Sequence, residues 1–244
     1  KNWREGTRIA IFEAYITNLG KYNEGVLAYE RVAFPTDAQT VEAALRKIGI
    51  DGIRYEEIFI SSYDGSMPQL YKHLGESENI DELNHLACVL LELSPDKLEK
   101  FEAVMDSGEY TGSAKDLINL AHNLDNYGFY PEIDSEEALG KMYIQDYGTL
   151  QVPEELIDYI DYEAYGRDAC INEDGHFAPG GYVFSYHGSF IERYNGIEDI
   201  PAEQRVFSMP KVPIREQIAA YQEMMDRAPP PAERTAPKTG REER

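Results

Sequence analysis

The chain has 244 residues, 42% of them hydrophobic, so it is long enough to bury a core, and its 23 basic and 45 acidic residues give a net charge of −22. This charge argues against direct binding of nucleic acid, whose phosphates need Lys and Arg, and against binding to anionic membrane surfaces. No apolar run reaches the roughly 18 residues that cross a bilayer, and the two distant cysteines match no disulfide or metal spacing, which suits a cytoplasmic protein.

The first part of the chain predicts a small α+β unit. Strands are predicted at 8–19, 26–34 and 55–63, and a helix at 38–48. The stretch 20–25 has the composition of a turn between the first two strands. Thr36 or Asp37 can cap the helix, and Gly49 can end it.

The middle of the chain predicts three short amphipathic helices. They are expected at 79–93, 95–108 and 113–124. Pro95 stands at the first position of the second helix, where proline is favoured. Three helices of this length form a compact helical subdomain.

A second α+β unit follows. The sequence predicts a strand at 126–133, placed at a sheet edge by Pro131, and a helix at 135–148 capped by Ser135. One or two helices begin at Pro153. A hairpin over 180–194 is expected to turn near His187 and Gly188.

The chain then changes character near Asn195. A helix over 213–225 carries Ile214, Ile218, Tyr221 and Met225 along one face, which is typical of a helix that docks on a partner surface. The Pro-rich remainder is predicted to be disordered. The fold expected overall is an elongated α+β chain of three small domains with a C-terminal tail, with boundaries at 1–74, 75–124, 125–195 and 196–244.

Catalytic and cofactor motifs are missing from the sequence. The five histidines do not pair with one another or with a cysteine at metal-ligand spacing. Phosphate-binding glycine loops and nucleophile motifs are missing too. Carboxylate pairs are frequent, but a chain this acidic produces them by chance. The sequence therefore predicts no catalytic residue, no metal and no cofactor, and a protein that is not an enzyme.

The negative charge is concentrated in one part of the chain. Residues 74–192 contain 5 basic and 26 acidic residues, whereas residues 206–244 contain 7 and 6. Self-repulsion of this kind destabilises a compact state. The simplest interpretation is solubility; the alternative is that the acids face a positively charged partner.

The densest part of this acidic region is "PEELIDYIDYEAYGRD", residues 153–168. Its acids are Glu154, Glu155, Asp158, Asp161, Glu163 and Asp168. If one helix runs through Asp161, three of them form a row at helical spacing, which approximates the one charge per roughly 1.7 Å of a DNA duplex. Tyr159, Tyr162 and Tyr165 follow at three-residue steps, and the simplest role for them is to pack the helix against the hairpin.

Two stretches carry a resemblance to a known family. "YITNLGKYNEGVL" (15–27) and "VPEELIDYIDYEAYGRD" (152–168) resemble the most recognisable stretches of the ArdA-type antirestriction proteins, and "YEEIFISSY" and "GYVF" follow in the expected order. The resemblance spans roughly residues 15–194. In this chain Tyr29 and Arg31 occupy places where relatives commonly have Gly and Trp, the stretch 171–180 is longer than expected, and the segment after Asn195 has no counterpart in typical members.

The resemblance implies a function. Members of the family are acidic, elongated dimers of three small domains that imitate bent DNA and occupy the DNA groove of type I restriction-modification enzymes, and they travel on mobile elements. It implies that Tyr159, Tyr162 and Tyr165 lie in packing or in the dimer contact, and that the acids of 153–168 lie on the mimic surface. Two copies of residues 15–205, each with a net charge of −24, would match about 80 Å of duplex.

Two other function classes compete with this reading. The chain could be an acidic interaction module for another basic DNA-binding protein of its mobile element. It could also be a hydrolase with clustered carboxylates, which would need a bound divalent metal and a measurable turnover.

Overall fold

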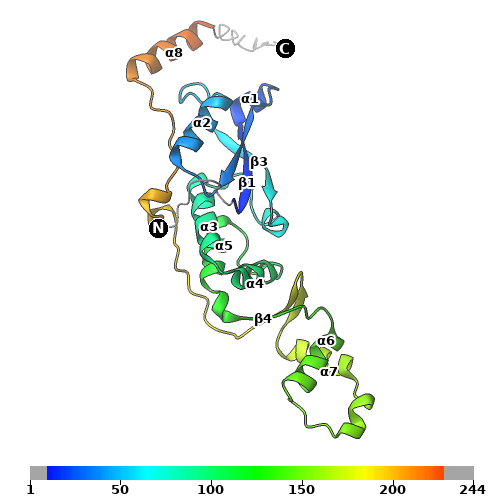
Figure 1. Ribbon diagram of the computed structural model, residues 1–244. Coiled ribbons are helices and arrows are strands. Elements are labelled where there is room, and N and C mark those ends of the chain that lie inside the picture. The colour runs from blue at the N-terminus through cyan, green and yellow to red at the C-terminus, as the bar shows by residue number, and fades with distance from the viewer. Residues whose placement is uncertain (1–9, 228–244) are drawn as a thin grey trace, which may run out of the picture.

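The computed structural model describes residues 10–227. It contains two three-stranded antiparallel sheets, and helices lie between and beside them along one long axis (Figure 1). The α+β class predicted from the sequence is confirmed.

The first sheet consists of strands β1 (Phe12–Asn18), β2 (Tyr29–Phe34) and β3 (Ile58–Gly65), in the order β2-β1-β3. The turn predicted at 20–25 is partly a short helix, α1 (Leu19–Asn23), because the Asn18 side chain accepts a hydrogen bond from the Lys21 amide and caps it. The third strand begins at Ile58, three residues later than predicted.

Helix α2 (Ala38–Ile48) covers one face of this sheet with four buried residues, Val41, Ala44, Leu45 and Ile48. It begins after Asp37, whose carboxylate accepts from the Thr40 amide, and it ends at Gly49, which has the left-handed φ of 82° that glycine tolerates. The predicted helix is thus confirmed at both ends. Tyr29 and Arg31 lie at exposed positions of β2, where Arg31 pairs with Glu13, so neither side chain is part of the core.

The three predicted middle helices are also confirmed, as α3 (Ile80–Glu92), α4 (Pro95–Met105) and α5 (Ala114–His122). Each begins at a polar side chain that accepts a hydrogen bond from a backbone amide of the first turn: Asn79, Ser94 and Ser113 respectively. A short 3-10 helix, Pro68–Lys72, joins the first sheet to this group.

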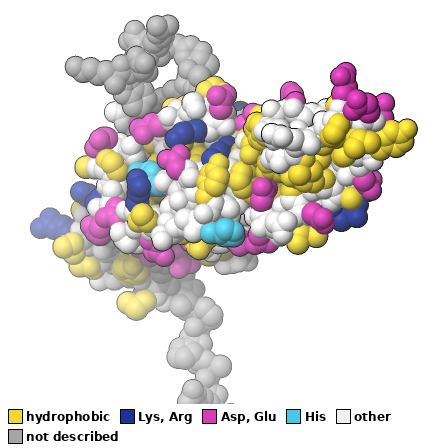
Figure 2. Space-filling view, turned by 90° about the horizontal axis from the view of Figure 1, so that it is seen from below, with side chains coloured by type: hydrophobic (Ala, Val, Ile, Leu, Met, Phe, Trp, Pro, Cys, Tyr) yellow, Lys and Arg dark blue, Asp and Glu magenta, His cyan; other side chains and the backbone are white. Residues whose placement is uncertain are grey.

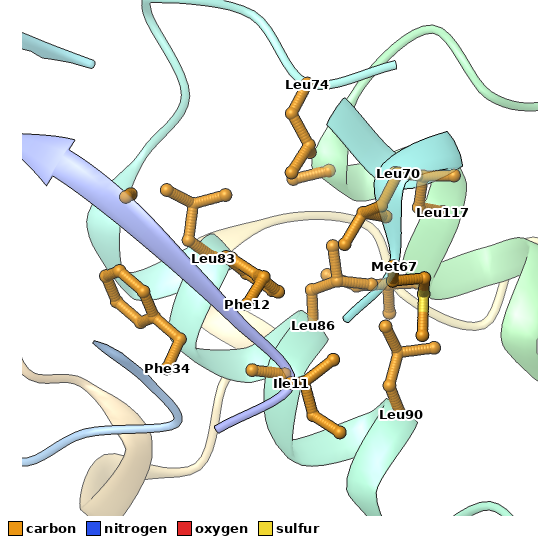
Figure 3. Close-up of a cluster of buried hydrophobic side chains, with 14 of the residues drawn as sticks. Ile11, Phe12, Phe34, Met67, Leu70, Leu74, Leu83, Leu86, Leu90 and Leu117 are labelled. Carbon is orange, nitrogen blue, oxygen red and sulfur yellow. The ribbon is translucent and has the colours of Figure 1, made fainter. Parts of the chain in front are cut away.

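One continuous hydrophobic core joins the first sheet to the helices. Phe12 and Phe34 from the sheet meet Leu83 and Leu86 from α3, and Leu70 fills the space beside them (Figure 3). A hydrogen bond also links the sheet to α3: the Thr36 backbone amide donates to the Asn84 side chain across 2.7 Å. The boundary predicted near residue 74 therefore falls inside a shared core.

The second sheet has the order β4-β6-β5 and consists of β4 (Tyr127–Pro131), β5 (His176–Ala178) and β6 (Gly181–Ser185). A short 3-10 turn, Leu124–Asn126, precedes it. Strand β4 is at an edge, as Pro131 predicted. Helix α6 (Glu136–Lys141) is capped by Ser135 and continues as a π-helical turn, Met142–Asp146. A second, smaller core of Leu139, Met142, Tyr143 and Tyr182 holds this unit together.

The predicted hairpin is misplaced. Its strands are β5 and β6 and its turn lies at Pro179 and Gly180, not at His187 and Gly188. After Ser185 the chain leaves the sheet. The Asn126 side chain holds the backbone there by donating to the Ser189 carbonyl across 3.1 Å.

The chain then returns along the helices to the first sheet (Figure 1). We call residues 189–209 the return segment. Asn119 of α5 and Asn123, which follows the helix, hold this segment as a neighbouring strand would: each side chain both donates to and accepts from its backbone at 2.8–2.9 Å. Ile200 and Val206 are 2% exposed and belong to the large core.

The return segment corrects the prediction of a tail that begins at Asn195. The buried Asp81 carboxylate accepts from the amides of Val206 and Phe207 at 2.6 and 2.7 Å. Two short 3-10 turns, Ile197–Asp199 and Ala202–Gln204, lie within the segment. The chain leaves the body only after about residue 212, since Pro210 and Val212 lie beside Gly52.

Helix α8 (Ile214–Arg227) follows, close to the helix predicted over 213–225. Its apolar residues Ile214, Ile218, Tyr221 and Met225 are 48–74% exposed, so this face is not docked on the body. The segment predicted to be disordered lies outside the described residues. Within residues 10–227, no helix is both long and apolar enough to cross a membrane.

Candidate partner-binding surface

The stretch 153–168 is held by two helices that cross backbone against backbone. Helix α7 (Tyr162–Asn172) packs on α6 through Gly166 and Gly140. A Cβ atom on Gly140 would collide with the Tyr162 carbonyl, and one on Gly166 would collide with the Glu136 carbonyl. Only glycine permits so close an approach, and it fixes both ends of the intervening loop.

We call that loop, residues 142–161, the ring (Figure 1). Its far side is a 3-10 helix, Glu154–Tyr159, which ends because Ile160 is extended. The predicted row of Glu154, Asp158 and Asp161 is therefore wrong: the helix does not run through Asp161, and a 3-10 helix does not align residues four apart.

All six predicted acids are exposed, but they differ in their contacts. Asp161 caps α7 by accepting from the Ala164 amide at 3.0 Å. Glu163 forms an ion pair with Arg167 at 3.3 Å. Glu154, Glu155, Asp158 and Asp168 make no ion pair within the described residues. Those four carboxylates keep their charge available to a partner.

The predicted tyrosines also separate into two kinds. The Tyr165 hydroxyl donates to Thr149 across 3.0 Å, and the Tyr162 hydroxyl accepts from Gln145 at 2.8 Å. Both hydrogen bonds connect α7 to the ring. Tyr159 is 83% exposed and makes no hydrogen bond within the described residues.

Tyr159 belongs to an apolar patch on the ring. The members of this ring patch are Tyr147, Leu150, Leu156 and Tyr159, which are 45–83% exposed. Figure 2 shows hydrophobic side chains gathered at this end of the molecule, with acidic side chains around them. Exposed apolar groups that lie together are typical of an interaction surface.

Arg167 is the basic residue of the acidic stretch, and it is engaged. Its Nε donates to Glu136 across 3.1 Å, and this hydrogen bond raises the pKa of the guanidinium. The ion pair also ties α7 to α6 beside the glycine crossing. Arg167 therefore neutralises acids of its own unit.

Few acids of the strongly acidic region are paired. Between residues 74 and 192 the structure is described throughout, and five of the 26 acids have a basic partner within 4.0 Å. The other 21 carboxylates face solvent or neutral groups. Because this region has only five basic residues, ion pairs within it cannot neutralise its 26 acids.

Comparison with known proteins identifies the family. The family model described as antirestriction protein (ArdA) matches residues 14–184. The chain belongs to the ArdA antirestriction family. The match begins inside β1, ends one residue before the end of β6, and includes the three middle helices and the ring. No curated protein matches the chain.

Membership settles the general nature of the activity. ArdA antirestriction proteins are inhibitors and not enzymes. The match ends before the return segment and α8, so those elements lie outside the part that the family model covers.

Sequence reasoning missed two features of this surface. The ring patch was not foreseen, because leucines at 150 and 156 fit a buried helix as well as an exposed loop. The close crossing of α6 and α7 at Gly140 and Gly166 has only a weak signal in the sequence. Each glycine interrupts a helical pattern. A glycine inside a helix lowers stability, so its presence often marks close packing.

Proposed function

We propose that the chain is a DNA mimic that occupies the DNA-binding groove of type I restriction-modification enzymes. The observation that carries this proposal is the set of 21 acids between residues 74 and 192 without a basic partner. A DNA-binding groove offers Lys and Arg placed to neutralise phosphates. Fifteen of these acids are exposed, and exposed carboxylates in such number supply the same countercharge.

The proposal includes the three small domains as successive parts of one long surface. The arrangement of the two sheets and the helices along one axis supports it (Figure 1). The core shared by the first sheet and α3 supports a fixed spacing of acids, because packed interiors resist deformation. A rigid mimic loses less conformational entropy on binding than a flexible acidic chain.

We further propose a homodimer formed through the ring patch. Two bodies with a net charge of −24 each repel one another, so their contact needs a surface that apolar groups dominate. The ring patch provides such a surface at the acidic end of the molecule. Pairing there would place two acidic surfaces in one line and double the length of the mimic.

The partner enzymes act on DNA inside the cell, and the proposed site of action is accordingly the cytoplasm. The competing partner is another basic DNA-binding protein of the same mobile element. Both partners offer a basic groove, so charge alone does not separate them. Direct competition with DNA for a type I methyltransferase does.

The test compares single and grouped neutralisations in that competition. Glu154→Gln and Asp158→Asn should each change the inhibitor's affinity by about fivefold or less, since exposed ion pairs contribute roughly 0–1 kcal/mol. Neutralising Glu154, Glu155, Asp158 and Asp168 together should weaken it cumulatively. Complete loss of inhibition from one substitution in a folded protein would show that a single site, and not a distributed surface, is responsible.

A further inference from the structure

The first sheet has one covered face and one open face. Helix α2 packs on the covered face, where Ala14 and Ile16 of β1 are buried. Tyr15 alternates with these two residues, so its side chain points to the other face, where its ring lies 5.8 Å from that of Tyr29. A groove of about 260 Å³ lies on this open face, lined by both tyrosines and by Leu27. Leu27 is 66% exposed and Tyr29 is 48% exposed.

A second aromatic pair extends the apolar surface of the open face. The ring of Tyr22, in α1, lies 5.2 Å from that of Phe59, in β3. Phe59 is paired with Thr17, which lies two residues after Tyr15 and therefore on the same face. Tyr22 is 54% exposed. We call this surface the sheet patch, and its members are Tyr15, Tyr22, Leu27, Tyr29 and Phe59.

The part of the chain around the sheet patch is nearly neutral. Residues 15–73 contain 6 basic and 8 acidic residues, against 5 and 26 in residues 74–192. Self-repulsion keeps strongly charged surfaces soluble and apart. The sheet patch lacks that protection, and an exposed apolar patch promotes association unless another element covers it. The open face of the first sheet therefore needs a cover.

Helix α8 carries an apolar stripe that is also uncovered. Ile214, Ile218, Tyr221 and Met225 follow at steps of four, three and four residues and thus lie on one side of the helix. This stripe is about 16 Å long at about 1.5 Å per residue, and β1 spans about 20 Å, so the two lengths match. A single helix of 14 residues is marginally stable in water, so α8 gains stability when its stripe is packed.

Helix α8 begins beside the loop that borders the sheet patch. Val212, two residues before the helix, lies next to Gly52. The same loop contacts the end of α1, because the Tyr55 hydroxyl donates to Glu24 across 2.8 Å. Figure 1 shows α8 at the end of the molecule that carries α1. The stripe and the patch therefore belong to neighbouring parts of one chain.

We infer that α8 closes over the sheet patch as a strap, so that its apolar stripe covers the open face of the first sheet as α2 covers the other. Residues 211–213 are neither helix nor strand and form the hinge. A segment on so short a connection meets its docking surface at an effective concentration on the order of 1 mM. The strap of the same chain therefore outcompetes a second copy at ordinary protein concentrations.

The first test follows the backbone amide resonances of the full chain by NMR. The double variant Ile218→Ser with Tyr221→Ser removes the centre of the stripe, so the amides of the sheet patch should shift relative to the unmodified chain. Glu216→Ser with Ala220→Ser places the same two serines on the opposite side of α8 and should leave those amides unchanged. Equal shifts in the two variants, or no shift at the sheet patch in either, would overturn the strap.

The second test changes the other half of the contact. Leu27→Ser with Tyr29→Ser should shift the amides of α8, because the stripe loses the surface on which it packs. The control is Gln39→Ser with Ala43→Ser, at exposed positions of α2, and it should leave the amides of α8 unchanged. Unchanged α8 amides in both variants would show that the stripe does not pack on the sheet patch.

Dilution separates closure within one chain from contact between two copies. The shifts produced by both double variants should be independent of protein concentration, because the strap and the patch belong to the same chain. Differences that disappear on dilution would show that a second copy covers the patch and would overturn the inference. These measurements need no restriction enzyme, so their outcome is separate from that of the proposed function.

Discussion

The return segment makes a sharp prediction about truncation. A chain that ends at residue 212 loses helix α8, whose apolar face is not docked on the body, together with the residues that follow it. A chain that ends at Asn195 also loses the segment that contains Ile200 and Val206. The first truncation should leave the fold intact, and the second should not.

The magnitude follows from burial. Ile200 and Val206 are both 2% exposed, and burying each stabilises the fold by roughly 1.5–3 kcal/mol. Asp81 would lose the two amides that donate to it, and a buried charge left without partners costs about 1–3 kcal/mol or more. The sum is about 4–9 kcal/mol, against a total stability of about 5–15 kcal/mol for a typical domain.

Thermal unfolding of the two truncated chains, followed by circular dichroism, measures the difference. At about 2–4 °C per kcal/mol for a chain of this size, the shorter chain should melt at least about 8 °C lower or fail to fold. Asp81→Ala in the full chain separates the carboxylate's share from that of the two apolar residues. If the chain that ends at Asn195 melts within about 2 °C of the longer one, the return segment is not part of the core.

Three other predictions concern packing, assembly and a thiol. Gly166→Ala should lower the melting temperature by several degrees, because overpacking costs about 1–3 kcal/mol. Gly75→Ala is the control and should leave the melting temperature unchanged, because its Cβ would meet only ordinary contacts. Equal stability of the two variants would contradict the close packing of α6 on α7 through Gly140 and Gly166. The double variant Leu156→Ser with Tyr159→Ser should reduce the mass measured by light scattering from about twice 27.8 kDa to that of one chain. Its circular dichroism spectrum should be unchanged. A double variant that stays dimeric would place the dimer contact elsewhere. Burial raises the pKa of the Cys88 thiol from 9.0 to about 11, so its alkylation at pH 8 should be about 100-fold slower than after unfolding, and a similar rate in both states would contradict its burial.

The sequence predicted what local chemistry determines. The bounds of α2 follow from Asp37 and Gly49, which act within their own turns, and Ser113 and Ser135 set the starts of α5 and α6 in the same way. Periodicity of apolar residues then identified the three middle helices. The density of acids identified the stretch 153–168, the resemblance supplied a family for it, and the family match confirms that resemblance.

The errors have a common physical cause, which is contact between distant parts of the chain. Gly188 resembles a turn residue, but a Cβ there would meet the Asn126 side chain, so this glycine serves the packing of the return segment. Strand β5 has three residues, too few for a periodic signal. The return segment is polar in composition, and its partners on α3 lie more than 100 residues earlier. Neither the spacing of apolar residues nor the helix and strand propensities of the sequence can predict contacts between segments so far apart.

Displacement of DNA from a type I methyltransferase, measured over a series of salt concentrations, tests the central claim most directly. If the carboxylates replace phosphates, the chain should displace DNA at low salt, and its affinity should fall steeply as salt rises, because binding sums many screened contacts. Failure to displace DNA at any salt concentration, or displacement that does not change with salt, would contradict the account.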